Sequence, residues 1–204
     1  MTPATIGVSK VAYIKNKVFP NSIYIILSLK AWISAEYHPS IDNSYVLWYN
    51  IYYMRVLVKS LYDTFDYVME HYYPFGLEEF AEKRDTYAII SIQDSHTGGF
   101  GIQFTTNRFC KDVLTLLIDD TVKEVDGAVL FNETHARQII DFIKKNRDKV
   151  DTLVIHCYAG QSRSAAVGAF AMEYLGQDSS DFIQNHRPNP YILKLLREFN
   201  HAAA

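Results

Sequence analysis

The residues of this chain best suited to chemistry lie between Cys157 and Ser164, where the sequence reads Cys-Tyr-Ala-Gly-Gln-Ser-Arg-Ser. An apolar run precedes them, and the small apolar residues that follow are typical of a buried helix. A loop of this length before a helix N-terminus can turn its backbone N–H groups inward, toward the positive end of the helix dipole. Gly160 permits the tight turn. The spacing therefore predicts a concave site for a tetrahedral anion, with a cysteine at its floor.

The side chains of this loop indicate nucleophilic attack by sulfur on a phosphate ester. Arg163 can bind two oxygens of the anion at once with its planar guanidinium, and that guanidinium also favours the thiolate form of Cys157. We expect Ser164 to donate a hydrogen bond to the sulfur, which makes it a better leaving group in a second step. We expect His156 to support the loop from the end of the preceding strand. The loop residues expected to bind the substrate are Tyr158, Ala159, Gly160, Gln161, Ser162 and Arg163.

The pattern around this loop predicts the fold class. From Arg55 onward, short apolar runs alternate with helical patterns, which is typical of an α/β domain. We expect a central, mostly parallel sheet of four to five strands flanked by helices. The candidate strands are residues 55–58, 86–92, 113–118 and 150–156.

The expected helices are recognised by their first residues and their apolar faces. Ser60 and Asn132 are expected to begin two of them, and a third begins near Arg163 and ends at Gly176. A short polar helix over residues 179–185 and a last amphipathic helix after Pro190 complete the domain. The apolar faces are Leu61, Phe65, Val68 and Tyr72 in the first helix, Ala136, Ile139, Ile140 and Ile143 in the second, and Ile192, Leu195, Leu196 and Phe199 in the last.

The segment 1–54 differs in composition from the rest of the chain and predicts an N-terminal extension of unknown role. Eleven of the 15 tyrosines precede residue 75. The aromatic and β-branched run at 45–54 favours extended structure, but it carries no chemical motif. We therefore divide the chain into an aromatic-rich extension, residues 1–54, and a catalytic domain, residues 55–200. We expect the extension to serve packing or contact with a partner.

Composition excludes several classes of protein. Twenty Lys and Arg against 23 Asp and Glu give a net charge of −3, so no basic surface is expected to attract nucleic acid or an anionic membrane. The longest runs without Asp, Glu, Lys, Arg or His, residues 18–29 and 43–54, are 12 residues each, short of the roughly 18 that a membrane span requires. Lys30 and Pro20 interrupt the apolar pattern that a targeting peptide needs, which favours an ordinary N-terminal segment over the alternative of a targeting remnant.

The number and spacing of the cysteines and histidines indicate the redox compartment of the protein and whether it binds a metal or cofactor. Cys110 and Cys157 are the two cysteines of the chain, which excludes a disulfide scaffold and a Cys-rich zinc site and favours a reducing, cytoplasmic location. The seven histidines show no metal-ligand spacing. We therefore expect neither a metal nor a cofactor.

The segment His156–Ser164 resembles the signature of the cysteine-based protein tyrosine phosphatase superfamily. The runs 87–92 and 114–121, and Arg187-Pro-Asn-Pro190 after the loop, are similar to the compact dual-specificity-like branch, in particular to small tyrosine phosphatases of bacteria and their phages. The resemblance covers about residues 55–200. It implies a tyrosine phosphatase-like fold, a phosphocysteine intermediate formed without metal, and a phosphorylated protein or peptide as substrate.

The resemblance also implies a general acid on a separate loop, because release of a phenolate or alkoxide is slow unless its oxygen is protonated. Asp119 and Asp120 are the candidates, although they precede Cys157 by somewhat more than is usual in the compact branch. Asp120, with Thr121 after it, matches the family better. Either aspartate could instead serve a turn or cap at a strand end. Further candidates for the acid are Glu124 and Asp126.

These observations predict a protein tyrosine phosphatase, with dual specificity as a possible extension. The alternatives are a phosphatase of phosphoinositides or RNA 5′-phosphates, a pseudophosphatase that binds phosphate without turnover, and a rhodanese-like sulfurtransferase. Polyanionic substrates usually require lysines in the loop, and this loop has none. The intact Cys157 and Arg163 argue against a pseudophosphatase, and a sulfurtransferase would need neither Ser164 nor a distant acid.

Overall fold

The structure is a computed structural model that describes residues 36–38, 46–48, 54–77, 85–97 and 101–201. The chain divides into two units, Met1–Asn50 and Ile51–Ala204. In the first unit, β1 (Glu36–His38) pairs antiparallel with β2 (Val46–Trp48), which lies within the run expected to be extended. Most of the proposed extension lies outside the described residues.

The second unit is built on a four-stranded sheet in which every pairing is parallel. The spatial order is β3-β6-β4-β5, so β6 lies in the interior of the sheet between β3 and β4. This confirms the expected α/β class and the number of strands. The strands are β3 (Arg55–Lys59), β4 (Tyr87–Gln93), β5 (Cys110–Leu117) and β6 (Thr152–His156).

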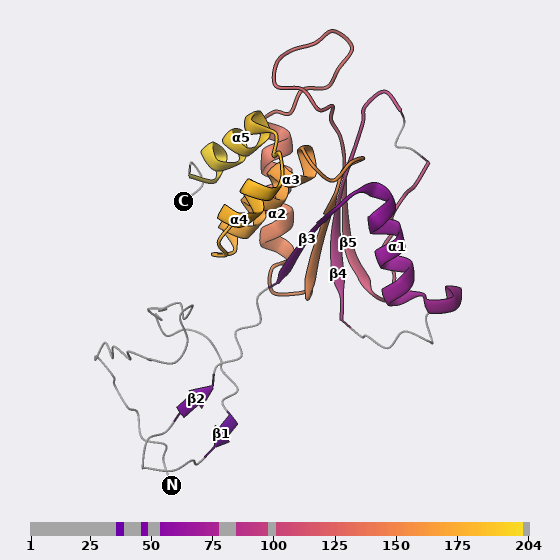
Figure 1. The fold of residues 1–204 in the computed structure, drawn as a ribbon, viewed down its shortest axis with the longest axis vertical. Helices are drawn as coiled ribbons and strands as arrows, with labels where there is room; N and C mark the ends of the chain where they lie inside the picture. The colour runs from indigo at the N-terminus through magenta and orange to yellow at the C-terminus, as the bar shows by residue number, and fades with distance from the viewer. Residues whose placement is uncertain (1–35, 39–45, 49–53, 78–84, 98–100, 202–204) are drawn as a thin grey trace, which may run out of the picture. The chain divides into compact units, whose positions relative to one another are not determined.

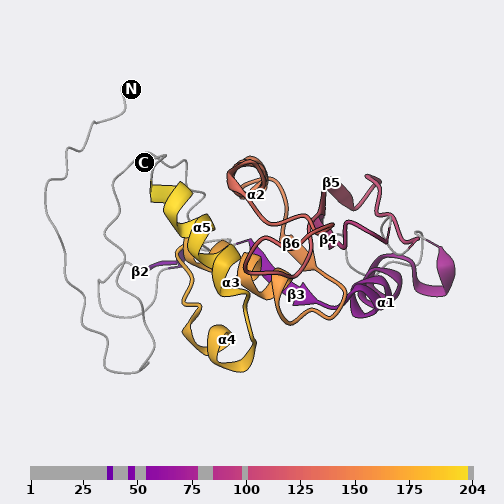
Figure 2. The same cartoon turned by 90° about the horizontal axis from the view of Figure 1, so that it is seen from above.

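Helices cover both faces of this sheet (Figures 1 and 2). Since side chains alternate along a strand, Ala88, Ile90 and Ile92 of β4 pack in one core and Tyr87 and Ile89 in another. α1 (Leu61–Tyr72) covers the second core. The first core is covered by α2 (Glu133–Asn146), α3 (Arg163–Tyr174) and α5 (Pro190–His201), with the short helix α4 (Ser180–Asn185) beside α3.

The helix that follows the Cys157 loop packs very closely on the sheet. All its residues from Arg163 to Ala171 are buried, as its small apolar sequence predicts. A Cβ atom on Gly168 would lie 2.2 Å from Cγ2 of Val58, so only glycine allows this approach to β3. The N-terminus of α3 is thereby fixed next to the carboxyl ends of the strands.

The buried face of α1 was predicted incorrectly at one residue. Phe65 of α1 is 45% exposed, although we expected it in the core, while Thr64 and Tyr67 are buried. The buried face of α1 is turned toward Tyr67, which accepts a hydrogen bond from Arg55 and packs on Tyr72. Thr64 tolerates burial because its hydroxyl donates to the Ser60 carbonyl.

A 3₁₀ turn, η1 (Pro74–Gly76), follows α1. No helix in the part of the chain that the structure describes is long and apolar enough to cross a membrane.

Candidate active site

The loop between β6 and α3 is held from outside by three hydrogen bonds from two neighbouring segments. The N–H of Leu61 donates to the carbonyl of Tyr158 at 3.1 Å, and the N–H of Arg187 donates to that of Gln161 at 3.2 Å. The N–H of Asn189 donates to the carbonyl of Ser162 at 3.1 Å. The start of α1 and the segment before α5 therefore determine the shape of this loop.

The same bonds determine the direction of the loop N–H groups. In a trans peptide, the carbonyl of one residue and the N–H of the next point in opposite directions, and no described peptide is cis. Because the carbonyls of Tyr158, Gln161 and Ser162 point outward, the N–H groups of the following residues, Ala159, Ser162 and Arg163, point into the loop. This arrangement suits an anion at the N-terminus of α3.

Cys157 lies at the floor of the loop and is 2% exposed. Its Sγ is 3.1 Å from Oγ of Ser164, and it accepts a hydrogen bond from the N–H of Gly160 at 3.3 Å. Gly160 has a φ of +73°, and a Cβ there would lie 2.6 Å from the backbone nitrogen of Ser60. The geometry thus brings together Cys157, the nucleophile that the sequence predicts, and the hydroxyl expected to stabilise it.

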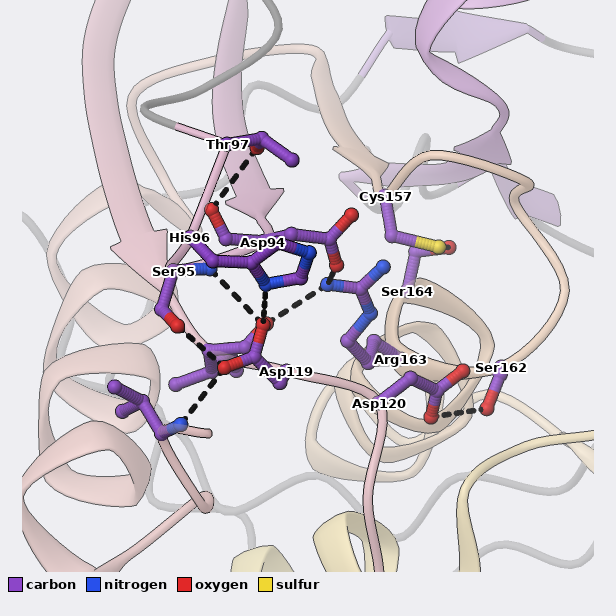
Figure 3. A network of polar contacts seen from close by, with 12 residues as sticks. Asp94, Ser95, His96, Thr97, Asp119, Asp120, Cys157, Ser162, Arg163 and Ser164 are labelled. Carbon is purple, nitrogen blue, oxygen red and sulfur yellow. Dashed lines mark hydrogen bonds and ion pairs between the residues drawn. The ribbon is translucent and has the colours of Figure 1, made fainter. Parts of the chain in front are cut away.

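Arg163 is 5% exposed, and its guanidinium contacts the described residues through Nη1. Nη1 lies 2.5 Å from Oδ1 of Asp94 and donates to the carbonyl of Ile118 at 2.8 Å (Figure 3). Nε is buried and has no partner among the described residues. A buried N–H without a partner costs free energy, so this edge of the guanidinium is suited to receive an anion.

The two candidate acids occupy very different environments (Figure 3). Asp119 is 7% exposed, and its carboxylate accepts from the N–H and Oγ of Ser95 and from the N–H of Val129, and contacts Nδ1 of His96. Burial by itself raises the pKa of Asp119, but these hydrogen bonds outweigh it and lower the pKa to about 2. Such a carboxylate is suited to hold a chain segment and poorly suited to donate a proton.

Asp120 is exposed and faces the loop instead. Its Oδ1 accepts from Oγ of Ser162 at 2.8 Å and from Nδ2 of Asn189 at 2.8 Å. Asn189 is 3% exposed, and its own oxygen accepts from the N–H groups of Tyr191 and Ile192 at the start of α5. Asp120 is therefore fixed at the rim of the loop by two donors on the same oxygen.

The imidazole of His156 contacts its described neighbours by packing rather than by hydrogen bonds. Neither ring nitrogen has a hydrogen-bond partner among the described residues, and the ring lies 5.3 Å from that of Phe104, centroid to centroid. Burial lowers the pKa of His156 to about 4, which the backbone of Cys157 only partly opposes. The imidazole is therefore neutral at pH 7.

The remaining loop residues form part of the rim. Tyr158 is 48% exposed and its ring meets that of Tyr62 edge to face, with centroids 6.4 Å apart. Gln161 is exposed and Ser162 half-buried. The other candidate acids, Glu124 and Asp126, are exposed and make no ion pair with the loop within the described part of the chain.

Two residues of the site escaped the sequence analysis. Asp94 directly follows β4, and in a parallel sheet the carboxyl end of β4 lies beside that of β6, which leads to Cys157. That adjacency is the signal that could have found it. Asn189 was noted only within Arg187-Pro-Asn-Pro190, one of the runs that resemble the family, and no role at the loop was expected of it.

Other features of the described residues lie apart from this loop. A hollow of about 600 Å³ at the opposite end of β3 and β6 is lined by residues that include Arg55, Arg147 and Asp151, but by none of the predicted site residues. Cys110 is buried in the core under α1, and burial raises the pKa of its thiol to about 11. No group of three or more His, Cys, Asp or Glu within the described ranges is placed to hold a metal ion.

Comparison with known proteins gives matches among solved structures. No family model and no curated protein sequence matches the chain. Human tyrosine phosphatase-like serine/threonine/tyrosine-interacting protein is 23% identical, over 58% of this chain and 79% of its own, with a TM-score of 0.42. DUSP15 is 21% identical over 72% and 84%, with a TM-score of 0.45, and PTPMT1 is 20% identical over 74% and 94%, with a TM-score of 0.45.

A further neighbour, human DUSP28, is 16% identical over 72% of this chain and 92% of its own, with a TM-score of 0.37. The sequence identities and the TM-scores of these matches are low. The chemistry of the site is therefore derived from its own geometry.

Proposed function

We propose that this chain is a cysteine-dependent phosphatase that hydrolyses phosphomonoesters, with phosphotyrosine in proteins or peptides as its substrate. The observation that carries this proposal is the loop itself. It combines a buried Cys157 sulfur beside Ser164, inward N–H groups, and an arginine whose buried Nε has no partner among the described residues. We assign the activity to residues 55–200 and regard residues 1–54 as an extension.

In the first step, the thiolate of Cys157 attacks phosphorus and the bond from phosphorus to the ester oxygen breaks. The loop N–H groups and Arg163 bind the remaining phosphate oxygens, on which charge is retained. Asp120 in its acid form donates a proton to the departing oxygen, since it lies at the rim where the leaving group exits. The products are an alcohol or phenol and a phosphocysteine.

In the second step, water attacks the phosphorus of the phosphocysteine and the phosphorus–sulfur bond breaks. Asp120, now a carboxylate, accepts the proton of the attacking water. Ser164, 3.1 Å from the sulfur, stabilises the thiolate as it leaves. Inorganic phosphate is released and the cysteine is regenerated.

The rim of the loop supports an aryl phosphate as substrate. The rings of Tyr62 and Tyr158 provide aromatic surface beside the loop, which favours stacking or edge contact with a phenyl ring. The loop residues around Cys157 contribute no lysine, which makes a polyanionic lipid or RNA 5′-phosphate the weaker alternative. Phosphoserine and phosphothreonine peptides would test dual specificity.

Hydrolysis of a generic aryl phosphate tests the proposal. We expect turnover that EDTA leaves unchanged, because the nucleophile is a thiolate, and that vanadate blocks, because it mimics five-coordinate phosphorus. Cys157→Ser should abolish turnover while a phosphotyrosine peptide still binds, since the loop N–H groups and Arg163 remain. Loss of activity on chelation would contradict the cysteine mechanism.

Two further outcomes would favour the alternatives. Binding without turnover in the wild-type protein would indicate a pseudophosphatase, and turnover of thiosulfate would indicate a sulfurtransferase. A panel of phosphotyrosine, phosphoserine, phosphoinositide and 5′-phosphorylated RNA substrates, compared by kcat/KM, assigns the substrate class.

A further inference from the structure

The guanidinium of Arg163 has one nitrogen fully committed to the protein. Nη1 carries two hydrogens, and its two acceptors are Oδ1 of Asp94 and the carbonyl of Ile118. These contacts restrict rotation of the guanidinium. The opposite edge of the guanidinium carries Nε, which has no partner among the described residues. This edge can therefore bind the anion.

Asp94 is itself held in place by the segment that follows it. The next residue, Ser95, donates its N–H and its hydroxyl to the carboxylate of Asp119, and His96 contacts the same carboxylate at 3.2 Å (Figure 3). Asp119 also accepts from the N–H of Val129, which ties it to the loop after β5. These contacts hold the segment directly after β4 in place, and they thereby fix the position of Asp94 next to Arg163.

We propose that Asp94 is a positioning residue that orients Arg163, so that the Nε edge of the guanidinium faces the phosphate. This inference rests on the proposed phosphatase function and adds a residue that the family motif in the sequence did not identify. An arginine that is 5% exposed requires a compensating charge, and the ion pair with Asp94 supplies it.

Two other roles for Asp94 make opposite predictions. A carboxylate close to a phosphate dianion repels it, so an Asp94 that merely competed for Arg163 would weaken anion binding. An Asp94 that acted as general acid would matter most for poor leaving groups. A positioning residue instead strengthens anion binding and affects all leaving groups alike.

Binding of sodium tungstate, a tetrahedral mimic of phosphate, measured by calorimetry distinguishes these roles without turnover. We expect Asp94→Ala to weaken tungstate binding about 10- to 100-fold, the range for a hydrogen bond to a charged group. Asp94→Asn should lose less, because its amide oxygen still accepts from Nη1. Unchanged or tighter binding by both variants would overturn the proposal.

Kinetics on aryl phosphates of increasing leaving-group basicity give the second measurement. Asp94→Ala should lower kcat/KM by a similar factor for every leaving group, whereas a steeper leaving-group dependence would identify an acid and overturn the positioning role. In an Arg163→Lys background, Asp94→Ala should cost little more, because it acts through the guanidinium. Additive losses would contradict that coupling.

The controls separate this inference from protein folding and from the proposed function. Asp141→Ala removes an exposed carboxylate on α2 that makes no ion pair among the described residues, and it should leave tungstate binding unchanged. Thermal unfolding checks that the Asp94 variants are folded, with Asp94→Asn as the nearly isosteric variant. Absence of turnover in the wild type would refute the phosphatase function, whereas full tungstate affinity in both Asp94 variants would refute only the positioning role.

Discussion

Two adjacent aspartates after β5 are placed in environments that suit different tasks. Asp119 is buried and accepts hydrogen bonds from the segment after β4, while Asp120 is exposed and contacts the Cys157 loop. The chain bends at Asp120, where the N–H of Thr121 donates to the carbonyl of Asp119 at 2.9 Å, and the two neighbouring side chains contact different segments. Of the two, Asp120 is the aspartate that contacts the loop in which we propose that the substrate binds.

We therefore predict that Asp120→Asn harms turnover in proportion to the basicity of the leaving group. Phenyl phosphate should lose about 10²-fold or more in kcat, and nitrophenyl phosphate far less, because a good leaving group needs little protonation. The basic limb of the pH–rate profile should flatten. A series of substituted phenyl phosphates measures this dependence.

Asp119→Asn is the matched comparison, since it changes the neighbouring carboxylate in the same way. We expect it to lower stability without steepening the leaving-group dependence. The reverse pattern in the two variants would make Asp119 the acid, and no leaving-group dependence in either would place the acid elsewhere on residues 122–131.

Arg163→Lys provides a separate prediction at the same scale. Lysine keeps the positive charge but lacks the planar pair of donors, so it cannot satisfy Asp94 and Ile118 and also bind two phosphate oxygens. We expect kcat/KM to fall by at least about 10²-fold. A rate near that of the wild type would contradict the bidentate geometry.

At the scale of elements, the β6–α3 loop keeps its shape because the start of α1 packs against it. Gly160 adopts a φ of +73° and leaves no room for a side chain next to Ser60. Gly160→Ala should therefore destabilise the protein by more than the roughly 1 kcal/mol cost of a left-handed residue, and it should impair turnover. Chemical unfolding and aryl phosphate hydrolysis measure the two effects.

Gly176 provides the control for this prediction. It has a φ of +74°, but a Cβ there would meet no atom within 4 Å. Gly176→Ala should show the conformational cost alone and keep its activity. Equal losses of stability in the two variants would mean that contact with Ser60 is unimportant.

Much of this element structure was predictable because local patterns and tertiary packing agree. Ser60 and Asn132 cap α1 and α2 as expected, and the apolar residues of α2 are buried. The runs of β4 and β6 were found because every residue of these two strands is buried, which gives a continuous apolar pattern. Phe65 was misplaced because helical periodicity alone does not determine how far a helix is rotated on its sheet.

The residues of the site that belong to one loop could be predicted from the sequence, whereas those that come from distant segments could not. Cys157, Arg163 and Ser164 belong to one loop, so their spacing alone brings them together. Asp94 and Asn189 come from segments that lie far from this loop in the sequence, one well before it and one after α3 and α4. Their contacts depend on strand order and on the packing of α5, which no local pattern encodes.

At the scale of the whole molecule, folding buries a neutral imidazole at the end of β6, next to Cys157. His156 is 1% exposed and its pKa falls from an ordinary value near 6.5 to about 4 because of burial. Between these two values the unfolded chain binds a proton that the folded protein does not. Stability therefore decreases as the pH falls from about 6.5 to about 4, by up to about 3 kcal/mol from this group.

Protonation of Asp119 also lowers the stability of the folded protein as the pH falls, but in a lower range of pH. Its pKa of about 2 in the folded protein lies below its ordinary value, so its stabilising contribution is present above about pH 4 and is lost as the pH falls further toward 2. The two groups thus affect separate ranges of pH. A loss of stability between pH 6.5 and 4 is assigned to His156 rather than to Asp119.

We predict that His156→Leu flattens the pH dependence of unfolding between pH 7.5 and 4. Leucine cannot take up a proton, and it replaces two ring nitrogens that have no partner among the described residues. Urea unfolding at intervals of half a pH unit, each variant referred to its own value at pH 7.5, should show a smaller loss for His156→Leu by up to about 3 kcal/mol. Parallel curves for the two proteins would mean that the imidazole is protonated in the folded state or reaches solvent, and the neutral, packed role of His156 would then be wrong.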